Sequence, residues 1–370
     1  MLNKNEFINF LKNKKVLITG HTGFKGAYLC ILLDLLGAKI YGYALKEESN
    51  SLFDMLNLRD ILSGECIADI RDYDKLYSFV KNVNPDYIIH MAAQPLVIDS
   101  YKEPKYTYEV NVIGTVNILE AIRQLQNEYN YKNIKDFNLL SFLNVTTDKV
   151  YENNDLNDYA FREDDKLCGY DPYANSKSCS ELVTYSYKKS FFADSQFSIS
   201  TARAGNVIGA GDISENRIIP DCNRAIIENK NMIIRNKNSV RPYQYVLEPL
   251  ITYLNILLIS SVDKNKSGSY NVGPDVIDCV NTETVVNLYF KYYEADNKPK
   301  VIAESDTQSD FHESKFLRLD NSLVKKVFDF KTIYNIEKGL EITAKGYKLF
   351  NENNKTELLQ YIQNTIENML

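Results

Sequence analysis

The sequence contains no tryptophan and has few of the residues that bind metal ions or form disulfide bridges. It has three histidines, His21, His90 and His312, which lie far apart in the chain. Its six cysteines are scattered and include no Cys-x-x-Cys pair. In a chain of this length, that pattern is typical of small buried cysteines in a reducing compartment. We therefore expect no metal centre and no disulfide framework.

The chain also lacks an excess of positive charge and a long apolar run. It carries 43 Lys and Arg against 49 Asp and Glu, a formal net charge of −6, and no basic block that could neutralise nucleic-acid phosphates. No stretch approaches the roughly 18 apolar residues of a membrane span. Residues 1–15 are polar and carry both charge signs, unlike a signal peptide. We expect a cytoplasmic protein that binds neither nucleic acid nor membrane.

What is present is the composition of an ordinary globular protein, with 44% hydrophobic and 25% charged residues over 370 positions. In the first 200 residues, β-rich runs alternate with helical patterns. Strands are expected near 15–19, 39–44, 65–69, 86–92, 138–145 and 197–202, and helices near 24–36, 73–83, 105–126 and 173–192. Strand–helix alternation at this spacing predicts a Rossmann-type, doubly wound parallel sheet with helices on both faces.

After about residue 206 the alternation weakens. Helices are expected near 218–229, 246–260 and 282–293, a strand near 269–273, and a helical tail over 336–370. This division predicts two parts. Residues 1–205 form a dinucleotide-binding domain that carries the catalytic residues, and residues 206–370 form mainly a smaller, mixed α/β substrate lobe. Part of this second segment is expected to return to the first domain.

A glycine-rich loop joins the first strand to the first helix of this alternation. Gly20, Gly23 and Gly26 have the spacing of a dinucleotide-binding turn, in which they allow the tight turn, the approach of a pyrophosphate and close helix packing. The phosphates would lie at the positive end of the helix. A purely structural glycine turn is the alternative. The second strand ends without the usual acid, so Asp69 after the third strand is the expected adenine contact, and the sequence leaves NAD and NADP undistinguished.

Two further pairs of residues have spacings that suit proton transfer. Tyr173 and Lys177 lie four residues apart at the start of a predicted helix, so they share one face. An ammonium group beside a phenol lowers the pKa of the phenol and makes it a base, although this spacing also arises by chance. Asp148 and Lys149 follow a predicted strand at the sheet edge where ligands bind. They are either an acid–base pair or a solvated turn.

Asn111 falls inside a predicted helix, where asparagine is mildly unfavourable. An inward-facing amide that orders a water molecule near the lysine is one explanation. A core asparagine whose hydrogen bonds are all made within the protein is the other.

Taken in order, these motifs resemble the extended short-chain dehydrogenase/reductase family of NAD-dependent epimerases and dehydratases. The similarity covers roughly residues 13–275. Within the family, the motifs are most similar to those of dehydratases that act on CDP-glucose. The segments that carry this similarity are Thr-Gly-His-Thr-Gly-Phe-Lys-Gly at 19–26, Ala-Ala-Gln-Pro-Leu-Val at 92–97, Thr-Asp-Lys-Val-Tyr at 147–151, Ala-Arg-Ala-Gly-Asn-Val-Ile-Gly at 202–209 and Arg-Pro-Tyr-Gln-Tyr at 241–245.

The resemblance implies a hydro-lyase that converts CDP-glucose to CDP-4-dehydro-6-deoxyglucose and water through bound NAD. Tyr173, assisted by Lys177, would take the proton of the 4-hydroxyl, Lys149 would take the C5 proton, and Asp148 would protonate the departing 6-hydroxyl. Thr147 would hold the 4-oxygen or the sugar. Asn111 completes the implied catalytic set.

The resemblance also implies a set of binding residues. The NAD-binding residues would be Gly20, Thr22, Gly23, Phe24, Lys25, Gly26, Asp69, Ile70, Met91, Ala92 and Ala93, together with Tyr173 and Lys177. The nucleotide sugar would be bound by Gln94, Asn206, Arg217 and Arg241, although each arginine taken singly fits a surface ion pair equally well. The family implies a homodimer formed by the helices that carry Asn111 and Tyr173.

Two competing functions remain open at this stage. A nucleotide-sugar 4-epimerase or reductase would share the glycine loop and the Tyr–Lys pair, but it would not need Asp148 and Lys149. A catalytically silent cofactor-binding protein would keep the fold without needing any of the four side chains.

Overall fold

The computed structural model describes residues 1–132, 137–155, 159–294, 299–303 and 314–370. Its centre is a seven-stranded sheet with the order β11-β6-β5-β4-β1-β2-β3, in which every neighbouring pair is parallel. The strands are β1 (Lys15–Thr19), β2 (Lys39–Ala44), β3 (Gly64–Ile67), β4 (Tyr87–His90), β5 (Ser141–Thr147), β6 (Ser198–Ala204) and β11 (Ser269–Val272). The predicted Rossmann-type, doubly wound fold is confirmed.

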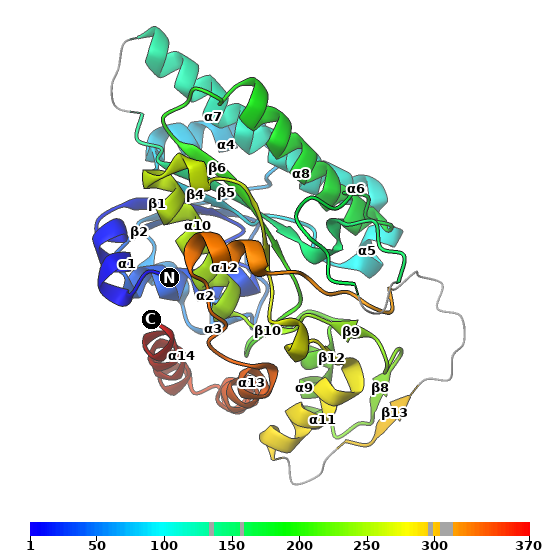
Figure 1. Ribbon diagram of the computed structural model, residues 1–370. Coiled ribbons are helices and arrows are strands. Elements are labelled where there is room, and N and C mark those ends of the chain that lie inside the picture. The colour runs from blue at the N-terminus through cyan, green and yellow to red at the C-terminus, as the bar shows by residue number, and fades with distance from the viewer. Residues whose placement is uncertain (133–136, 156–158, 295–298, 304–313) are drawn as a thin grey trace.

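Helices cover both faces of this sheet (Figure 1). One face packs against α4 (Tyr73–Val83), α7 (Gly114–Tyr131) and α8 (Pro172–Ser190), and the other against α2 (Phe24–Leu35) and α10 (Leu247–Val262). Successive residues of β1 enter opposite cores: Val16 and Ile18 join the α2/α10 side, and Leu17 the α4/α7/α8 side. Strands buried on both faces explain the continuous apolar runs in the sequence.

The helix predicted for 105–126 is interrupted in the structure. A short α5 (Val97–Lys102) is followed by α6 (Pro104–Tyr108), a π-helical turn at Glu109–Ile113, and then α7. A π turn inserts one extra residue into the helical register and is common at functional sites. Here it contains Asn111, whose buried side chain is directed at the end of β4. Periodicity alone could not reveal this insertion.

The sequence analysis also missed the first helix, α1 (Lys4–Leu11). Asn3 and Glu6 form a capping box at its start, and Phe7 and Leu11 are buried. The polar character of residues 1–15 therefore belongs to an amphipathic helix that packs on the domain.

The second half of the chain divides between a smaller lobe and the sheet. The lobe pairs β7 (Val207–Ile208) with β10 (Gln244–Tyr245), β8 (Met232–Ile234) with β13 (Val301–Ala303), and β9 (Val240–Arg241) with β12 (Val280–Asn281). Its helices are α9 (Ile218–Ile227), α11 (Thr282–Tyr293) and α13 (Ile336–Asn351). In contrast, α10, β11 and α12 (Ser322–Phe328) pack on the main sheet, and α14 (Lys355–Met369) packs on α2.

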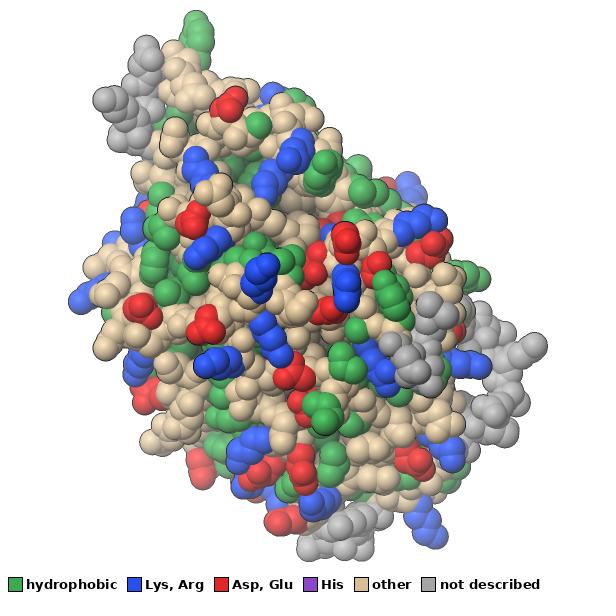
Figure 2. Space-filling model, in the orientation of Figure 1, with side chains coloured by type: hydrophobic (Ala, Val, Ile, Leu, Met, Phe, Trp, Pro, Cys, Tyr) green, Lys and Arg blue, Asp and Glu red, His purple; other side chains and the backbone are tan. Residues whose placement is uncertain are grey.

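The surface charges and the cysteines do not indicate a further functional site. On the face shown in Figure 2, Lys and Arg alternate with Asp and Glu without a large area of one sign. All six cysteines are free; Cys30, Cys222 and Cys279 are buried, and Cys168 is exposed, contrary to the expectation that all are buried. In the described part of the chain, no helix is long and apolar enough to span a membrane, and no cluster of metal-ligating side chains occurs.

Candidate active site

The glycine loop has the geometry of a phosphate-binding turn. Gly20 has φ +81°, and a Cβ atom there would lie 2.9 Å from the Ala92 nitrogen. A Cβ on Gly26 would lie 2.4 Å from the Gly20 carbonyl oxygen. Gly23 differs from both, because its Cβ would meet nothing closer than 3.6 Å. It is the N-cap of α2 and has no side chain to cap the helix. The open space at the helix N-terminus therefore fits a ligand phosphate.

The rest of the predicted cofactor surface adjoins this loop. Thr22 donates its hydroxyl hydrogen to the Leu45 carbonyl at the end of β2 (3.0 Å). Residues 91–93 follow β4, and the Met91 and Ala92 nitrogens donate to the Thr19 hydroxyl at 3.1 Å. Phe24 packs edge-on against Tyr28 and next to Gly209.

Asp69 and Ile70 lie beyond β3. The Asp69 carboxylate is bound by Arg71, which also binds Glu109 and lies 4.8 Å above the ring of Tyr106. Asp69, Arg71 and Glu109 line an open surface pocket. An adenine contact by Asp69 would therefore form next to a guanidinium group, a partner that the sequence did not reveal.

The Thr-Asp-Lys turn at the end of β5 holds one unusual carboxylate. Asp148 is fully buried, and its Oδ1 accepts hydrogen bonds from the Thr147 hydroxyl (3.0 Å) and the Lys149 ammonium (3.3 Å). Asp148 Oδ2 is buried without a partner in the described structure. A buried carboxylate oxygen left unpaired costs free energy unless a ligand satisfies it. A solvated turn is thus excluded, and an oxygen is available for substrate.

Tyr173 and Lys177 lie on the first turns of α8 beside this turn. Burial raises the pKa of Tyr173 to about 12, and a hydrogen bond with Thr147 only partly offsets that rise. The pKa of Tyr173 is thus raised and not lowered as predicted, because burial disfavours the charged phenolate. Lys177 Nζ donates to the Val145 carbonyl at 3.2 Å. Burial lowers the pKa of Lys177 to about 8, although the nearby Glu181 carboxylate opposes this shift.

Lys25 reaches this cluster of side chains from the glycine loop. Its ammonium lies 3.5 Å from the hydroxyl of Tyr253, a buried residue of α10. Burial lowers the pKa of Lys25 to about 7, and the positive charges of Arg217 and Lys177 lower it further, whereas Asp148 opposes them. The loop that fits a dinucleotide and the residues that fit proton transfer therefore belong to one site.

Two predicted site residues serve the scaffold. Asn111 Oδ1 accepts from the Gln94 nitrogen (2.9 Å), and its Nδ2 donates to the Gln94 carbonyl and to Ser176 of α8. The Gln94 side chain is bonded to Thr107 and to the Leu96 backbone. The second explanation of Asn111, a core amide satisfied within the protein, agrees with this geometry.

The residues predicted to bind the nucleotide sugar differ in whether their polar groups are already bound within the protein. Asn206 Oδ1 lies 3.5 Å from Lys149 Nζ, inside the site. Arg217 is half-buried and paired with Asp212 at 3.2 Å, close enough to influence Lys25 and Tyr173. The Arg241 guanidinium is buried and donates to the carbonyls of Val240, Ser314 and Lys315. Arg241 thus holds residues 314–315 against β9.

His90 belongs to the scaffold of the site, although it was not among the predicted site residues. His90 is buried at the end of β4, its Nδ1 2.7 Å from the Thr19 hydroxyl and its Nε2 3.3 Å from Thr115 of α7. Burial lowers its pKa to about 3, so it is neutral and joins β1, β4 and α7.

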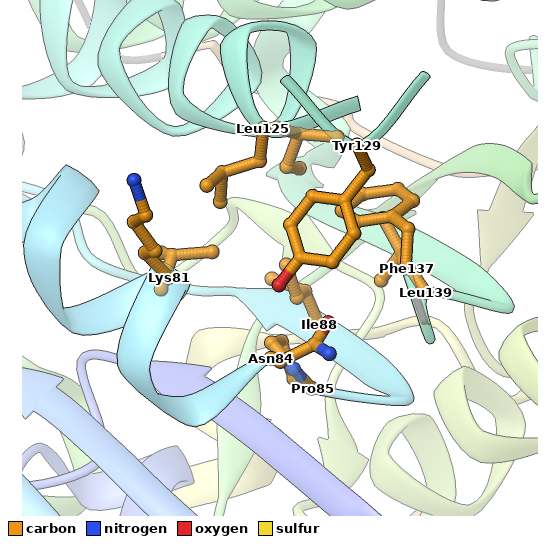
Figure 3. A pocket seen from close by; sticks show the side chains of 10 residues that line it. Lys81, Asn84, Pro85, Ile88, Leu125, Tyr129, Phe137 and Leu139 are labelled. Carbon is orange, nitrogen blue, oxygen red and sulfur yellow. The ribbon is translucent and has the colours of Figure 1, made fainter. Parts of the chain in front are cut away.

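A second pocket lies elsewhere and has an apolar lining. Figure 3 shows it between α4, α7 and the start of β4, with Asn84 and Pro85 at one side and Tyr129 and Phe137 at another. It adjoins the amino end of β4, whereas ligands of open α/β sheets bind at the carboxyl ends. It plays no part in the candidate site.

Comparison with known proteins adds independent information. A family model described as GDP-mannose 4,6 dehydratase matches residues 17–343. The CDP-glucose 4,6-dehydratase of Salmonella typhimurium is 38% identical over 321 residues, which cover 85% of this chain and 85% of that protein. The dTDP-D-glucose 4,6-dehydratase of Dictyostelium discoideum is 29% identical over 287 residues, 71% of this chain and 58% of that protein.

Solved structures of similar fold include a dTDP-glucose 4,6-dehydratase from Bacillus anthracis in complex with NAD. It has a TM-score of 0.71 at 21% identity and covers 93% of this chain and 99% of its own. A Thermotoga maritima UDP-glucose 4-epimerase with UDP-glucose gives a TM-score of 0.73 at 17% identity, covering 91% of this chain and 99% of its own. At such identities these structures establish the fold.

Proposed function

The chain belongs to the GDP-mannose 4,6 dehydratase family, and on that premise we propose that it is an NAD-dependent hydro-lyase that dehydrates CDP-glucose to CDP-4-dehydro-6-deoxyglucose. One observation carries the proposal: the buried Asp148 carboxylate, paired with Lys149 and with Oδ2 unpartnered, adjoins Tyr173 through Thr147. An epimerase or reductase needs the tyrosine but has no use for a buried acid–base pair.

The cofactor is NAD. The open N-terminus of α2 at Gly23, with the close-packed Gly20 and Gly26 on either side, fits its diphosphate, and Asp69 with Ile70 would face the adenine. Residues 91–93, Tyr173 and Lys177 would surround the reactive end. When bound, NAD would supply the hydride transfer, accepting the hydride of the sugar C4 and giving it back at C6, so no external reductant would be consumed.

Tyr173 begins the reaction as the base for the 4-hydroxyl proton. With a pKa of about 12, Tyr173 is a protonated phenol at neutral pH and cannot take the proton, so substrate binding must bring a positive charge that stabilises its phenolate. Lys177 on the same helix face and Arg217 are the cations placed to do this. Thr147, which contacts both Tyr173 and Asp148, would hold the 4-oxygen between them.

Lys149 and Asp148 then remove water across C5 and C6. Neutral Lys149 takes the C5 proton, and protonated Asp148 gives its proton to the departing 6-hydroxyl. This step leaves the ion pair that the structure records at 3.3 Å. As the product forms, Lys149 returns its proton to C5. The proton that Tyr173 took from the 4-hydroxyl replaces the one that Asp148 gave to the departing water, so the protons balance over one turnover.

The smaller lobe, built from parts of residues 206–370, would bind the nucleotide diphosphate. Arg217 at its start is the natural bidentate phosphate ligand, since it lies close to Lys25 and Tyr173. Asn206 would contact the sugar beside Lys149. Arg241 and Gln94 would act indirectly, by holding residues 314–315 and the 94–97 loop.

The enzyme would work as a homodimer in the cytoplasm. Of the apolar positions on α7 and α8, Leu119 and Ile122 are buried within the chain, whereas Leu182 is 53% exposed. Tyr185 of α8, Tyr108 of α6 and Ile113 of the π-helical turn are also exposed, and a second copy would cover this face. The six unpaired cysteines suit a reducing compartment.

The decisive experiment incubates the purified protein with CDP-glucose without added reductant and follows the sugar nucleotide by mass spectrometry. UDP-, GDP- and dTDP-hexoses serve as parallel substrates. Loss of one water from CDP-glucose alone supports the whole proposal, and loss from another nucleotide sugar would change the substrate but keep the reaction. With bound NAD demonstrated, no water loss from any substrate would favour an epimerase or reductase.

The same assay tests the role of Lys149. Lys149→Ala should still oxidise C4 but release no dehydrated product, so NADH should accumulate on the protein and absorb at 340 nm. Full turnover by Lys149→Ala would rule out Lys149 as the C5 base.

A further inference from the structure

A buried ion pair lies behind the candidate site. Glu181 of α8 and Arg203 of β6 approach to 3.0 Å, and their side chains are 2% and 4% exposed. We propose that Glu181 and Arg203 are positioning residues, which hold the helix carrying the Tyr–Lys pair in register with the strand that ends in the Thr-Asp-Lys turn. The inference rests on the proposed dehydration, but it concerns residues that touch neither sugar nor cofactor.

The Glu181 carboxylate binds the sheet at three points. One oxygen accepts from the Thr146 hydroxyl of β5 (2.5 Å), and the other accepts from the Thr201 hydroxyl (2.7 Å) and the Arg203 guanidinium of β6. Thr146 directly precedes Thr147 in the chain. Glu181 also lies four residues after Lys177, on the same face of α8. One carboxylate therefore joins the helix directly beneath Lys177 to the strand directly before the turn.

The Arg203 guanidinium secures the other end of that turn. It donates to the Tyr151 hydroxyl and to the Glu163 carbonyl, both at 2.9 Å, and lies 5.2 Å above the Tyr151 ring. Tyr151 is two residues after Lys149. Its ring stacks on Phe161 at 5.0 Å, and its hydroxyl donates to Asn271 of β11 at 2.6 Å. The turn is thus held before Thr147 through Glu181 and after Lys149 through Arg203.

The burial of the Glu181–Arg203 ion pair is not explained by a gain in folding stability. Two charges removed from water gain little net free energy, and apolar side chains of similar size often serve as well or better. A hydrogen-bond network that fixes the two elements of the candidate site against each other does give a reason for the burial, because displacement by about 1 Å can cost a catalyst roughly 100-fold in rate.

Glu181 also has an electrostatic effect on Lys177. Burial lowers the pKa of Lys177, and the Glu181 carboxylate raises it. The other charged or titratable groups that sense Lys177 are Lys25 of α2 and His90 of β4, and His90 is neutral. Removal of the Glu181 charge should therefore lower the pKa of Lys177, which a purely structural contact would not do.

The test compares Glu181→Gln with Thr201→Val. Gln keeps the size of Glu181 but loses its charge. Val at 201 removes one hydrogen bond to the same carboxylate and keeps that charge. We expect Glu181→Gln to reduce kcat at least tenfold with KM within threefold, and to move the alkaline limb of kcat/KM to lower pH by half a unit or more. Thr201→Val should leave the alkaline limb in place.

A direct titration separates this inference from the proposed function. The Lys177 Cε resonance, assigned by its loss in Lys177→Arg, is followed by NMR against pH in wild type and Glu181→Gln. A lower midpoint in the variant supports the inference even if CDP-glucose is not the substrate. If Glu181→Gln does not fold, Glu181→Gln/Arg203→Met, which leaves no unpaired guanidinium, takes its place. A folded variant with wild-type kcat and an unmoved Lys177 midpoint overturns the inference.

Discussion

Replacing Gly23 by alanine should weaken NAD binding while leaving the fold intact. Gly23 has φ −77° and ψ 172°, which alanine adopts freely, and its added Cβ would have 3.6 Å to the nearest atom. The methyl group would instead occupy the open side of the helix N-terminus, where the cofactor's diphosphate must approach the backbone. The change thus separates binding from folding.

The magnitudes follow from the same geometry. Alanine is a poorer N-cap than glycine, but it also restricts the unfolded chain, so the free energy of unfolding should change by less than about 1 kcal/mol. Gly26→Ala is the matched control. Its Cβ would lie 2.4 Å from a backbone oxygen that cannot rotate away, which should cost about 1–3 kcal/mol of stability. For Gly23→Ala, loss of close phosphate contact should weaken NAD binding at least tenfold, or about 1.4 kcal/mol.

Urea unfolding and isothermal titration with NAD measure the two quantities for each variant. Gly23→Ala should unfold near the wild-type midpoint and bind NAD weakly, whereas Gly26→Ala should unfold at a lower urea concentration. Wild-type NAD affinity in a folded Gly23→Ala would refute the placement of the diphosphate at this turn. A large loss of stability in Gly23→Ala would show that the space is not open.

Three further predictions concern single side chains. Asp148→Asn removes the acid but keeps its shape, so water loss should fall roughly 100- to 10,000-fold while NADH appears at 340 nm on addition of substrate; steady wild-type product release would contradict this. Tyr173→Phe should bind NAD but form no NADH with CDP-glucose, and a normal burst of NADH would assign the first base elsewhere. Burial raises the pKa of Glu248 to about 7, although its carboxylate accepts from the Ile333 and Tyr334 nitrogens. The folded state therefore holds a proton that the unfolded state has lost, and stability falls as pH rises from about 4.5 through 7. Between pH 5 and 8, wild type should lose on the order of 1–3 kcal/mol more than Glu248→Gln, and parallel stability curves would contradict this assignment.

The sequence predicted the elements of the sheet and the residue types of the site. Strand–helix alternation follows from apolar runs that must be buried on both faces, and the glycine spacing follows from a turn that side chains would block. These are local requirements, so they are visible in a single chain. The interrupted helix at residues 109–113 was not, because its extra residue serves a contact between Asn111 and Gln94, seventeen positions away in the chain.

Local sequence patterns also do not indicate which polar side chains form hydrogen bonds within the folded protein. Arg241 and Gln94 were predicted to bind the nucleotide sugar. Instead, Arg241 donates to the Lys315 carbonyl from a distant segment, and Gln94 donates to the Thr107 hydroxyl of α6 and to the nearby Leu96 carbonyl. Lys25 was predicted to be part of the cofactor-binding loop, but its ammonium group lies beside Tyr253, which is 228 residues away in the chain. Each outcome depends on atoms brought near by folding.

The Rossmann-type sheet, the glycine turn and the order of the candidate catalytic residues could be predicted from the sequence, because backbone conformation and burial pattern are set over short stretches. The pKa values and hydrogen-bond partners of those residues depend on the folded structure. Burial raises the pKa of Tyr173 and lowers that of Lys177, and Asp148 has one buried oxygen without a partner in the described structure. Glu181 of α8 binds Thr146 of β5 and Arg203 of β6. The burial and the hydrogen-bond partners of these side chains arise only when strands β5 and β6 pack against helix α8.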